Sequence, residues 1–200
     1  MDTCDFRKKL FKLVAATPPD EAAITAVIYE AKTDIELLFT EQQLELLLKK
    51  YPNNWRFHIL LGNIFQVHTQ YHNSITHLQK ALDLNPNSYQ ALNNCGVAFK
   101  KLNKASEAIK YFLKALEINI ECEDALKNLA VHFYEVKEPE KALQFSSQLV
   151  RLKSNESNTM FLHGNILRDL KYFEQALFAY EEAIYLNPGK AKIFFNKGIV

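Results

Sequence analysis

Histidine is the residue type in this chain whose spacing first suggests chemistry. His68, His72 and His77 lie close together, and His68 and His72 are four residues apart, a spacing that metal sites use. A predicted helix break separates these two residues, however, and no Cys, Asp or Glu completes a set of ligands. We therefore expect three polar side chains on a solvated edge rather than a metal site.

The other reactive residue types do not form a catalytic pattern either. Cys4, Cys95 and Cys122 have no metal-ligand spacing, and their odd number fits a reducing, intracellular compartment. No Ser/His/Asp arrangement, Gly-rich phosphate loop or pair of carboxylates emerges. The sequence thus predicts no catalytic residue, no cofactor and no metal, and it predicts that this segment is not itself an enzyme.

Charge and hydropathy narrow the range of partners. The net charge is +1, so nothing in the bulk composition indicates binding to nucleic acid or to a membrane surface. No stretch approaches 18 uninterrupted apolar residues, and the N-terminal apolar stretch is broken by charges, which argues against a secretory signal. We therefore expect a cytoplasmic protein with neither a nucleic-acid nor a membrane partner.

An internal repeat of 34 residues sets the secondary-structure elements on which any binding site must lie. The small residues that mark it recur at one fixed step: Gly62, Gly96, Ala130, Gly164 and Gly198. A period in this range is typical of a stacked solenoid. We define four full units, 55–88, 89–122, 123–156 and 157–190, followed by 191–200 as the start of a truncated fifth.

Each unit contains two stretches with helical spacing of apolar residues, separated by a short polar break. Neither helix can bury its apolar stripe alone, so each must pack on its partner and on the next unit. Glycine in the middle of the first helix costs roughly 1 kcal/mol of helix propensity relative to alanine. Its recurrence predicts a close approach of the second helix, with the series Ser74, Ala108, Ala142 and Ala176 facing it.

The pattern resembles the tetratricopeptide repeat family. The first unit carries Leu61, Gly62, Phe65, Ser74, Leu78, Ala81 and Pro86, and the fourth carries Gly164, Leu167, Ala176, Tyr180, Ala183 and Pro188. The resemblance implies an all-α fold, a right-handed superhelical solenoid of stacked antiparallel helix pairs with a concave groove lined by the first helices. Unit 123–156 departs from it at Ser146, Leu149 and Ser154, so we expect its second helix to pack differently.

Residues 1–54 are predicted to form a helical N-terminal cap. One helix should end at Pro18-Pro19, and Asp20 should cap a second that runs to about Ala31. Thr40-Glu-Gln-Gln43 resembles a capping box that opens a third helix, Leu44 to Tyr51. Pro52 lies one repeat before Pro86, so 21–54 fits a degenerate repeat, as terminal repeats often are.

The predicted groove is the candidate binding site, because repeat arrays bind along their concave surface. Asparagine recurs on it once per unit, and an amide can pair with the backbone of an extended peptide. This row partly resembles the asparagine ladder of O-linked N-acetylglucosamine transferases, whereas the basic clamp of heat-shock co-chaperones is absent. The candidate peptide-binding residues are Asn63, Gln66, Asn93, Asn94, Lys101, Lys127, Asn128, Tyr134, Phe161, Asn165, Arg168 and Asn196.

These residues predict a scaffold that binds a protein or an extended peptide segment, without catalysis of its own. Two alternatives stay open. The chain ends within an apolar half-helix, which suggests a fragment, so it could be the N-terminal arm of a glycosyltransferase or sulfotransferase. It could also be a self-association module in which Phe194, Phe195 and Ile199 of the stump pair with a second copy as a homo-oligomer.

Overall fold

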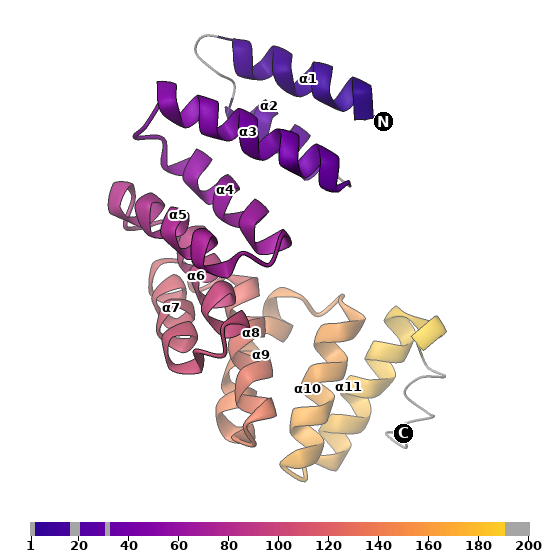
Figure 1. Cartoon of the computed structure of the whole chain (residues 1–200). Helices are drawn as coiled ribbons and strands as arrows, with labels where there is room; N and C mark the ends of the chain where they lie inside the picture. The colour runs from indigo at the N-terminus through magenta and orange to yellow at the C-terminus, as the bar shows by residue number, and fades with distance from the viewer. Residues whose placement is uncertain (1–2, 17–20, 31–32, 191–200) are drawn as a thin grey trace. The chain divides into compact units, whose positions relative to one another are not determined.

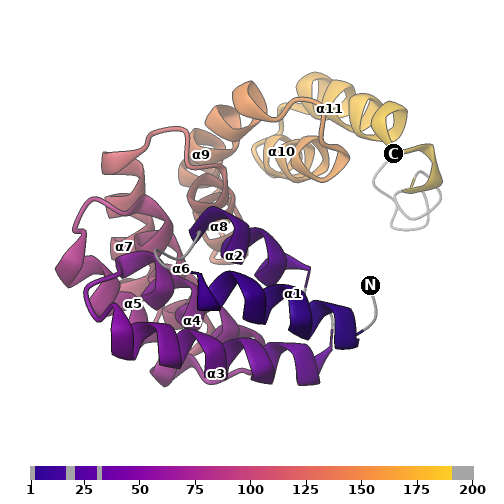
Figure 2. The ribbon, with the colours of Figure 1, turned by 90° about the horizontal axis from the view of Figure 1, so that it is seen from above.

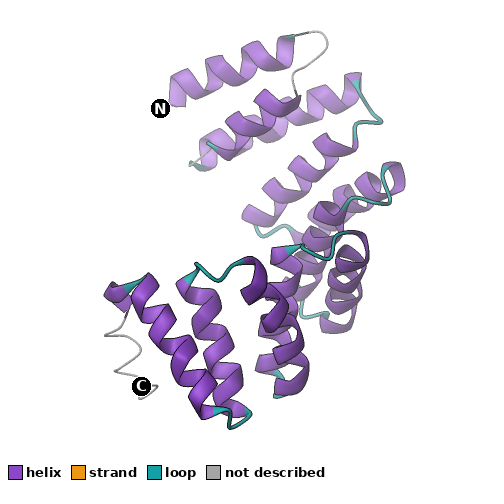
Figure 3. Cartoon of the chain, turned by 180° about the vertical axis from the view of Figure 1, so that it is seen from behind, coloured by secondary structure: helices purple, strands orange, loops and turns teal. Residues whose placement is uncertain are grey.

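Eleven α-helices and one short 3₁₀ turn make up the described part of the computed structural model, which comprises residues 3–16, 21–30 and 33–190. Figure 3 shows this part as helices joined by loops, with no strand in it. The expectation of an all-α fold is therefore confirmed. The chain divides into two compact units, residues 1–111 and 112–200, and the division falls within helix α7 (Ala105–Ile118).

The first unit begins with three helices that precede the regular repeats. They are α1 (Thr3–Ala15), α2 (Glu21–Tyr29) and α3 (Asp34–Lys50). Helix α1 contacts both α2 and α3, and α3 contacts α4 (Trp55–Val67). Their buried core contains Phe6, Leu10, Ile24, Val27, Leu44 and Leu47, together with Phe57, Leu60 and Leu61 of α4. The apolar stripes of these helices thus meet in one interior.

The predicted start of the third helix is wrong. Helix α3 begins at Asp34, and its capping box is formed by Thr33 and Glu36: Glu36 N donates to Thr33 Oγ1, and Thr33 N donates to the Glu36 carboxylate. Thr40 is buried inside the helix, where its hydroxyl donates to the Glu36 carbonyl at 2.7 Å. Thr33 and Glu36 have the same capping-box spacing as Thr40 and Gln43, and they start the helix earlier in the chain. The expected stop at Pro18-Pro19 and the Asp20 cap lie outside the described residues.

Helix pairs follow in regular order along the chain (Figure 1). In the first unit, α4 packs on α5 (Tyr71–Leu84), and both contact α6 (Tyr89–Lys101). Asn54 and Ser88 cap α4 and α6 with their side chains. A second core joins these helices through Ile59, Leu78, Ala81, Ala91 and Cys95, and Phe99 stacks on Tyr111 with ring centroids 5.2 Å apart.

The second unit repeats this arrangement. Its helices after α7 are α8 (Glu123–Glu135), α9 (Pro139–Leu152), α10 (Ser157–Asp169) and α11 (Phe173–Leu186), followed by the turn η1 (Pro188–Lys190). Helix α8 packs on α9, α9 on α10 and α10 on α11. Figures 1 and 2 both show α10 and α11 side by side. Adjacent helices are therefore paired within this unit as well.

The turns within the helix pairs share one backbone geometry. Thr69, Asn103, Lys137 and Lys171 all have φ between 58° and 64°, in the left-handed region. The amide of the next residue donates back into the first helix, as Gln70 N does to the Phe65 carbonyl at 2.8 Å. This is the Schellman arrangement, which usually places glycine at the left-handed position. None of these four residues is glycine, so the turns at Thr69, Lys137 and Lys171 carry a local backbone cost, whereas asparagine tolerates this conformation at Asn103.

Close approach of the second helix accounts for Gly62 and Gly164, as expected, but the nearest side chain lies outside the expected series. A Cβ atom on Gly62 would lie 2.7 Å from Leu78 Cγ, and one on Gly164 would lie 2.7 Å from Tyr180 Cε1. The carbonyl oxygens of Ser74 and Ala176 come next, 3.4 and 3.3 Å away. The glycine therefore makes room for the large side chain four residues further along the second helix.

Candidate functional site

The compact unit of residues 1–111 brings four predicted groove residues into one hydrogen-bonded group, called here the amide cluster: Asn63, Gln66, Asn93 and Asn94. Asn94 Nδ2 donates to Asn63 Oδ1 at 2.7 Å, which links α6 to α4. Gln66 Nε2 donates to the Asn94 carbonyl at 2.8 Å and to Ser74 Oγ at 3.3 Å. The amides that the sequence placed on one surface therefore do meet, and they pair with one another.

Asn93 is the exceptional member of the amide cluster. Its side chain is 6% exposed and donates through Nδ2 to Asn94 Oδ1 at 3.2 Å. Its Oδ1 is buried without a hydrogen-bond partner in the part of the chain that the structure describes. A buried acceptor of this kind costs free energy until a donor reaches it. Lys101, the other predicted groove residue of this unit, is exposed at the end of α6.

The second unit contains a different group, called here the arginine–tyrosine cluster: Tyr134, Asn165, Arg168, Asp169 and Tyr180. Arg168 donates to Asp169 Oδ1 at 3.3 and 2.9 Å, and this ion pair lies close enough to Tyr134 to influence the pKa of its phenol. Tyr180 donates its hydroxyl to Asn165 Oδ1 at 3.0 Å, and its ring lies against Phe161, centroid to centroid 5.8 Å. Sequence reasoning named Tyr134, Phe161, Asn165 and Arg168 but missed Tyr180 and Asp169.

Burial and neighbouring charges raise the pKa values of the two tyrosines and the arginine in this second cluster. Burial is the main cause that raises the pKa of both Tyr134 and Tyr180, and the charge of Asp169 adds to it. The hydrogen bonds to Asp169 raise the pKa of the Arg168 guanidinium. Both phenols therefore stay protonated and able to donate near neutral pH, beside a permanent positive charge.

The remaining predicted groove residues are less constrained. Lys127 is exposed on α8, and Asn128 is half-buried beside it. Asn196 lies outside the described residues, as do the predicted fifth unit and the apolar residues of its stump. The self-association alternative, which rests on that stump, stays a prediction.

The three histidines that drew attention in the sequence are not brought together. His68 lies 3.6 Å from Glu41, His72 is exposed, and His77 pairs instead with His58 of α4, with the two Nδ1 atoms 3.1 Å apart. Burial lowers the pKa of His77 to about 4, and the charges of His58 and Lys80 add to the effect. Burial also lowers the pKa of His58. This pair joins two helices, and the sequence offered no spacing that would reveal it.

A half-buried histidine, His163, contacts the divergent residue Ser146 of unit 123–156. The Ser146 hydroxyl lies 2.9 Å from His163 Nδ1, which connects α9 to α10 where the other units carry a large apolar or aromatic residue. Burial lowers the pKa of His163. The described residues contain no group of three or more His, Cys, Asp or Glu side chains placed to hold a metal ion.

No helix in the described ranges combines the length and hydropathy needed to span a bilayer. Two surface hollows, of about 420 and 400 Å³, are lined by residues other than the predicted groove set. The first is bordered by His58, Lys80 and Asp83, and the second by Met160, His163 and Phe178. The candidate site therefore consists of the two polar clusters, whose members lie on the first helices except for Tyr180 of α11, rather than of an enclosed pocket.

Comparison with known proteins agrees with this architecture. Residues 59–121 and 157–190 each match the tetratricopeptide repeat family. No curated protein sequence matches the chain. Among solved structures, MamA is 20% identical with a TM-score of 0.69, over 78% of this chain and 92% of its own. YrrB, described as a TPR protein with an unusual peptide-binding site, is 15% identical with a TM-score of 0.67, over 97% and 100%. The 34-residue register, the paired helices and these matches together show that the chain belongs to the tetratricopeptide repeat family.

Proposed function

We propose that this chain is a scaffold that binds a partner protein, through an extended peptide segment, on the faces of its first helices. The observation that carries the proposal is the amide cluster. Asn63, Gln66 and Asn94 are only half-buried, and Asn94 joins Asn63 across two successive first helices. A row of amides on a surface offers donors and acceptors at regular intervals.

The chemistry of the amides matches a peptide backbone. Each side-chain amide has two N–H donors and an oxygen with two lone pairs, and Asn63 uses only its oxygen in the contact with Asn94. An extended peptide presents one N–H and one C=O per residue, so it can bond to such a row without a specific sequence.

The test begins with a probe of defined composition. We suggest selecting binders from a displayed library of random dodecapeptides with the full 200-residue chain, then measuring their affinity by fluorescence anisotropy. Changing Asn94 and Asn128 together to Ala should weaken binding by roughly tenfold to a hundredfold, since each neutral hydrogen bond contributes about 0.5–1.5 kcal/mol.

A matched control uses asparagines away from these faces. Asn73 on α5 and Asn155 in the loop before α10 are both exposed, so the double Asn73→Ala/Asn155→Ala variant should bind as the parent does. Circular dichroism should show the same helicity for all three proteins. An unchanged affinity of the Asn94/Asn128 variant would refute the proposed role of the amides, and a loss of helicity would show that they are structural instead.

A further inference from the structure

Two exposed aromatic side chains distinguish α11, the second helix of unit 157–190. Phe178 is 61% exposed and Tyr185 is 80% exposed, and the two lie seven residues apart, on one face of the helix. The equivalent positions of the three other units carry exposed polar or charged side chains: Thr76, Lys110 and Gln144 at the first, and Asp83, Glu117 and Arg151 at the second. An exposed aromatic pair at positions that are otherwise polar indicates an interaction surface.

Packing of a following repeat does not account for these two rings. Helix α6 packs on α5, and α10 packs on α9, as the first helix of the next unit in each case. The equivalent residues of α5 and α9 remain exposed in spite of those contacts: Thr76, Asp83, Gln144 and Arg151. By the repeat symmetry, a first helix packed on α11 would leave Phe178 and Tyr185 in solvent. The solenoid itself therefore provides no cover for them.

An apolar hollow of about 400 Å³ lies beside Phe178. Three helices supply its apolar lining: Val150 of α9, Met160 and Leu167 of α10, and Phe178 and Ala179 of α11. His163 also borders the hollow, and because burial lowers its pKa, its imidazole is neutral near neutral pH. The hollow can take one large apolar side chain, in the way that interface pockets hold their anchor residues.

Negative charge surrounds the two rings. Helix α11 carries three carboxylates and no basic residue: Glu174, Glu181 and Glu182. Glu174 and Glu181 are exposed and alternate with the rings, since positions 174, 178, 181 and 185 are separated by four, three and four residues and so share one face. We call these four residues the acidic aromatic face.

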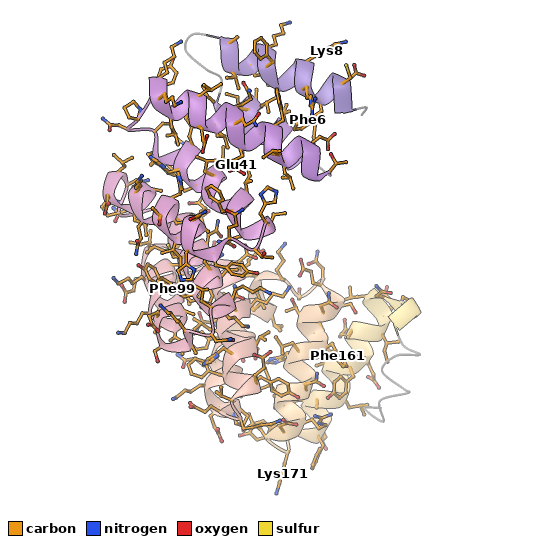
Figure 4. All side chains as sticks on the ribbon, viewed as in Figure 1. Phe6, Lys8, Glu41, Phe99, Phe161 and Lys171 are labelled. Atoms are coloured by element: carbon orange, nitrogen blue, oxygen red, sulfur yellow. The ribbon has the colours of Figure 1, made fainter. Side chains whose placement is uncertain are left out.

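The described basic side chains nearby do not neutralise these carboxylates. Lys171, in the turn before α11, extends away from the helix pair (Figure 4). Arg168 of α10 is paired with Asp169. The basic residues of α9 and of the loop after it are matched by acidic ones: Lys141 pairs with Glu138, Lys153 pairs with Glu123 and Glu156, and Arg151 is offset in number by Glu140. The acidic aromatic face therefore favours a positively charged partner.

We propose that the acidic aromatic face binds an amphipathic helix of a partner protein, one that carries a large apolar side chain next to Lys or Arg residues. Phe178 and Tyr185 are about 10 Å apart along the helix axis, which matches the seven-residue spacing of apolar positions on a helix lying alongside. The apolar anchor enters the hollow beside Phe178, and its basic neighbours face Glu174 and Glu181. Two copies of this chain joined through the same face would bring like charges together, which disfavours a homodimer.

This surface goes beyond the scaffold function proposed above, because it lies on a second helix and takes a helix rather than an extended peptide. The test uses a displayed library of helical peptides about five turns long, with one face randomised. Peptides selected on the full 200-residue chain should carry an aromatic or aliphatic residue with Lys or Arg one turn away, and a positive net charge.

Two double variants then test the face by fluorescence anisotropy. Phe178→Thr/Tyr185→Asp copies the residues of unit 55–88 and should weaken the selected helices by about tenfold to a hundredfold. Glu174→Gln/Glu181→Gln should weaken them less and should reduce the effect of added salt, because rim charges act through screened electrostatics. Circular dichroism should show the helicity of the parent for both.

Two controls separate this surface from the rest of the chain. Phe11→Thr removes a comparably exposed phenylalanine from α1 and should bind the selected helices as the parent does. Asn94→Ala/Asn128→Ala should also leave their affinity unchanged. A loss in the asparagine variant equal to that in Phe178→Thr/Tyr185→Asp would overturn the proposal of a separate surface.

Further results would also contradict the proposal. Selected helices that bind Phe178→Thr/Tyr185→Asp as tightly as the parent, or that carry no excess of Lys and Arg, would overturn it, as would a library that yields no binder. If that variant loses helicity, Glu174→Gln/Glu181→Gln decides, and unchanged affinity there would overturn the proposal. Dimerisation of the parent in sedimentation, abolished by Phe178→Thr/Tyr185→Asp, would assign the face to a second copy instead.

Discussion

The contact between Gly164 and Tyr180 provides a quantitative test of the repeat packing. In a Gly164→Ala variant the new Cβ would lie 2.7 Å from Tyr180 Cε1, 2.8 Å from Cδ1 and 3.3 Å from the Ala176 carbonyl oxygen. Tyr180 is 3% exposed, and its hydroxyl and ring are held by Asn165 and Phe161. The ring therefore cannot move aside without losing those contacts.

Two opposing effects set the size of the change. Alanine is favoured over glycine in a helix by about 1 kcal/mol, whereas overpacking a dense interior costs about 1–3 kcal/mol. Gly164→Ala should therefore lower local stability by up to about 2 kcal/mol. In unit 123–156 the equivalent positions carry alanine and a small side chain, Ala130 and Ser146. The double variant Gly164→Ala/Tyr180→Ser reproduces this pair and should remove the clash. The cost of Gly164→Ala should therefore be about 1–3 kcal/mol smaller in the presence of Tyr180→Ser than in its absence.

Hydrogen exchange read by mass spectrometry suits this measurement, because repeat arrays open locally and do not melt as one unit. The protection of α10 and α11 is followed, and that of α4 and α5 in the same molecule is the internal reference. Ala130→Gly is the matched control: it should cost about 1 kcal/mol of helix propensity and relieve no clash. Strictly additive effects of Gly164→Ala and Tyr180→Ser would refute the argument that the glycine exists to admit the ring.

Three further outcomes are expected. Thr69→Gly should raise stability by about 0.5–1 kcal/mol in urea titrations, because φ of 59° is costly for a β-branched residue. The free energy of unfolding should fall as the pH decreases from about 6.5 to about 4. The pKa of His77 is about 4 in the folded chain and 6.5 in the unfolded chain, so the unfolded chain binds the proton first. Because His77 is only half-buried and solvent screens its charge, the loss is roughly 1–2 kcal/mol. Amide exchange should find the segment from Ser146 to Leu152 less protected than residues 106–118, because small and polar residues replace the usual apolar ones there.

Each of these has a control. Thr76 is exposed in the middle of α5, so Thr76→Gly should lower the free energy of unfolding, whereas Thr69→Gly should raise it. A change in the same direction for both variants would contradict the turn geometry. His77→Gln should reduce the pH dependence, whereas His72→Gln, at an exposed position, should not. A slope that His77→Gln leaves unchanged would exclude His77 as its main cause. Equal protection of the two helices would show that the Ser146–His163 contact compensates fully for the lost apolar packing.

The repeat register and the helix pairs were predictable from the sequence because their signals are local. Apolar spacing, capping residues and the recurring glycines each depend on residues within one or two turns of a helix. The same locality explains the error at the N-terminus: Thr33 with Glu36 and Thr40 with Gln43 both have the spacing of a capping box, and only the packing of the whole helix decides between them. The left-handed turns were missed because Thr69, Lys137 and Lys171 lack the glycine that usually marks them.

The candidate site depended on contacts between residues that the sequence keeps far apart. The sequence placed Asn63 and Asn94 on one surface, but only the packing of α4 against α6 brings their amides to 2.7 Å. His58 meets His77, and Tyr180 meets Asn165, for the same reason: helix pairing juxtaposes side chains whose separation along the chain has no characteristic pattern. The local periodicity therefore determined which faces exist, and the tertiary packing decided which side chains on those faces touch.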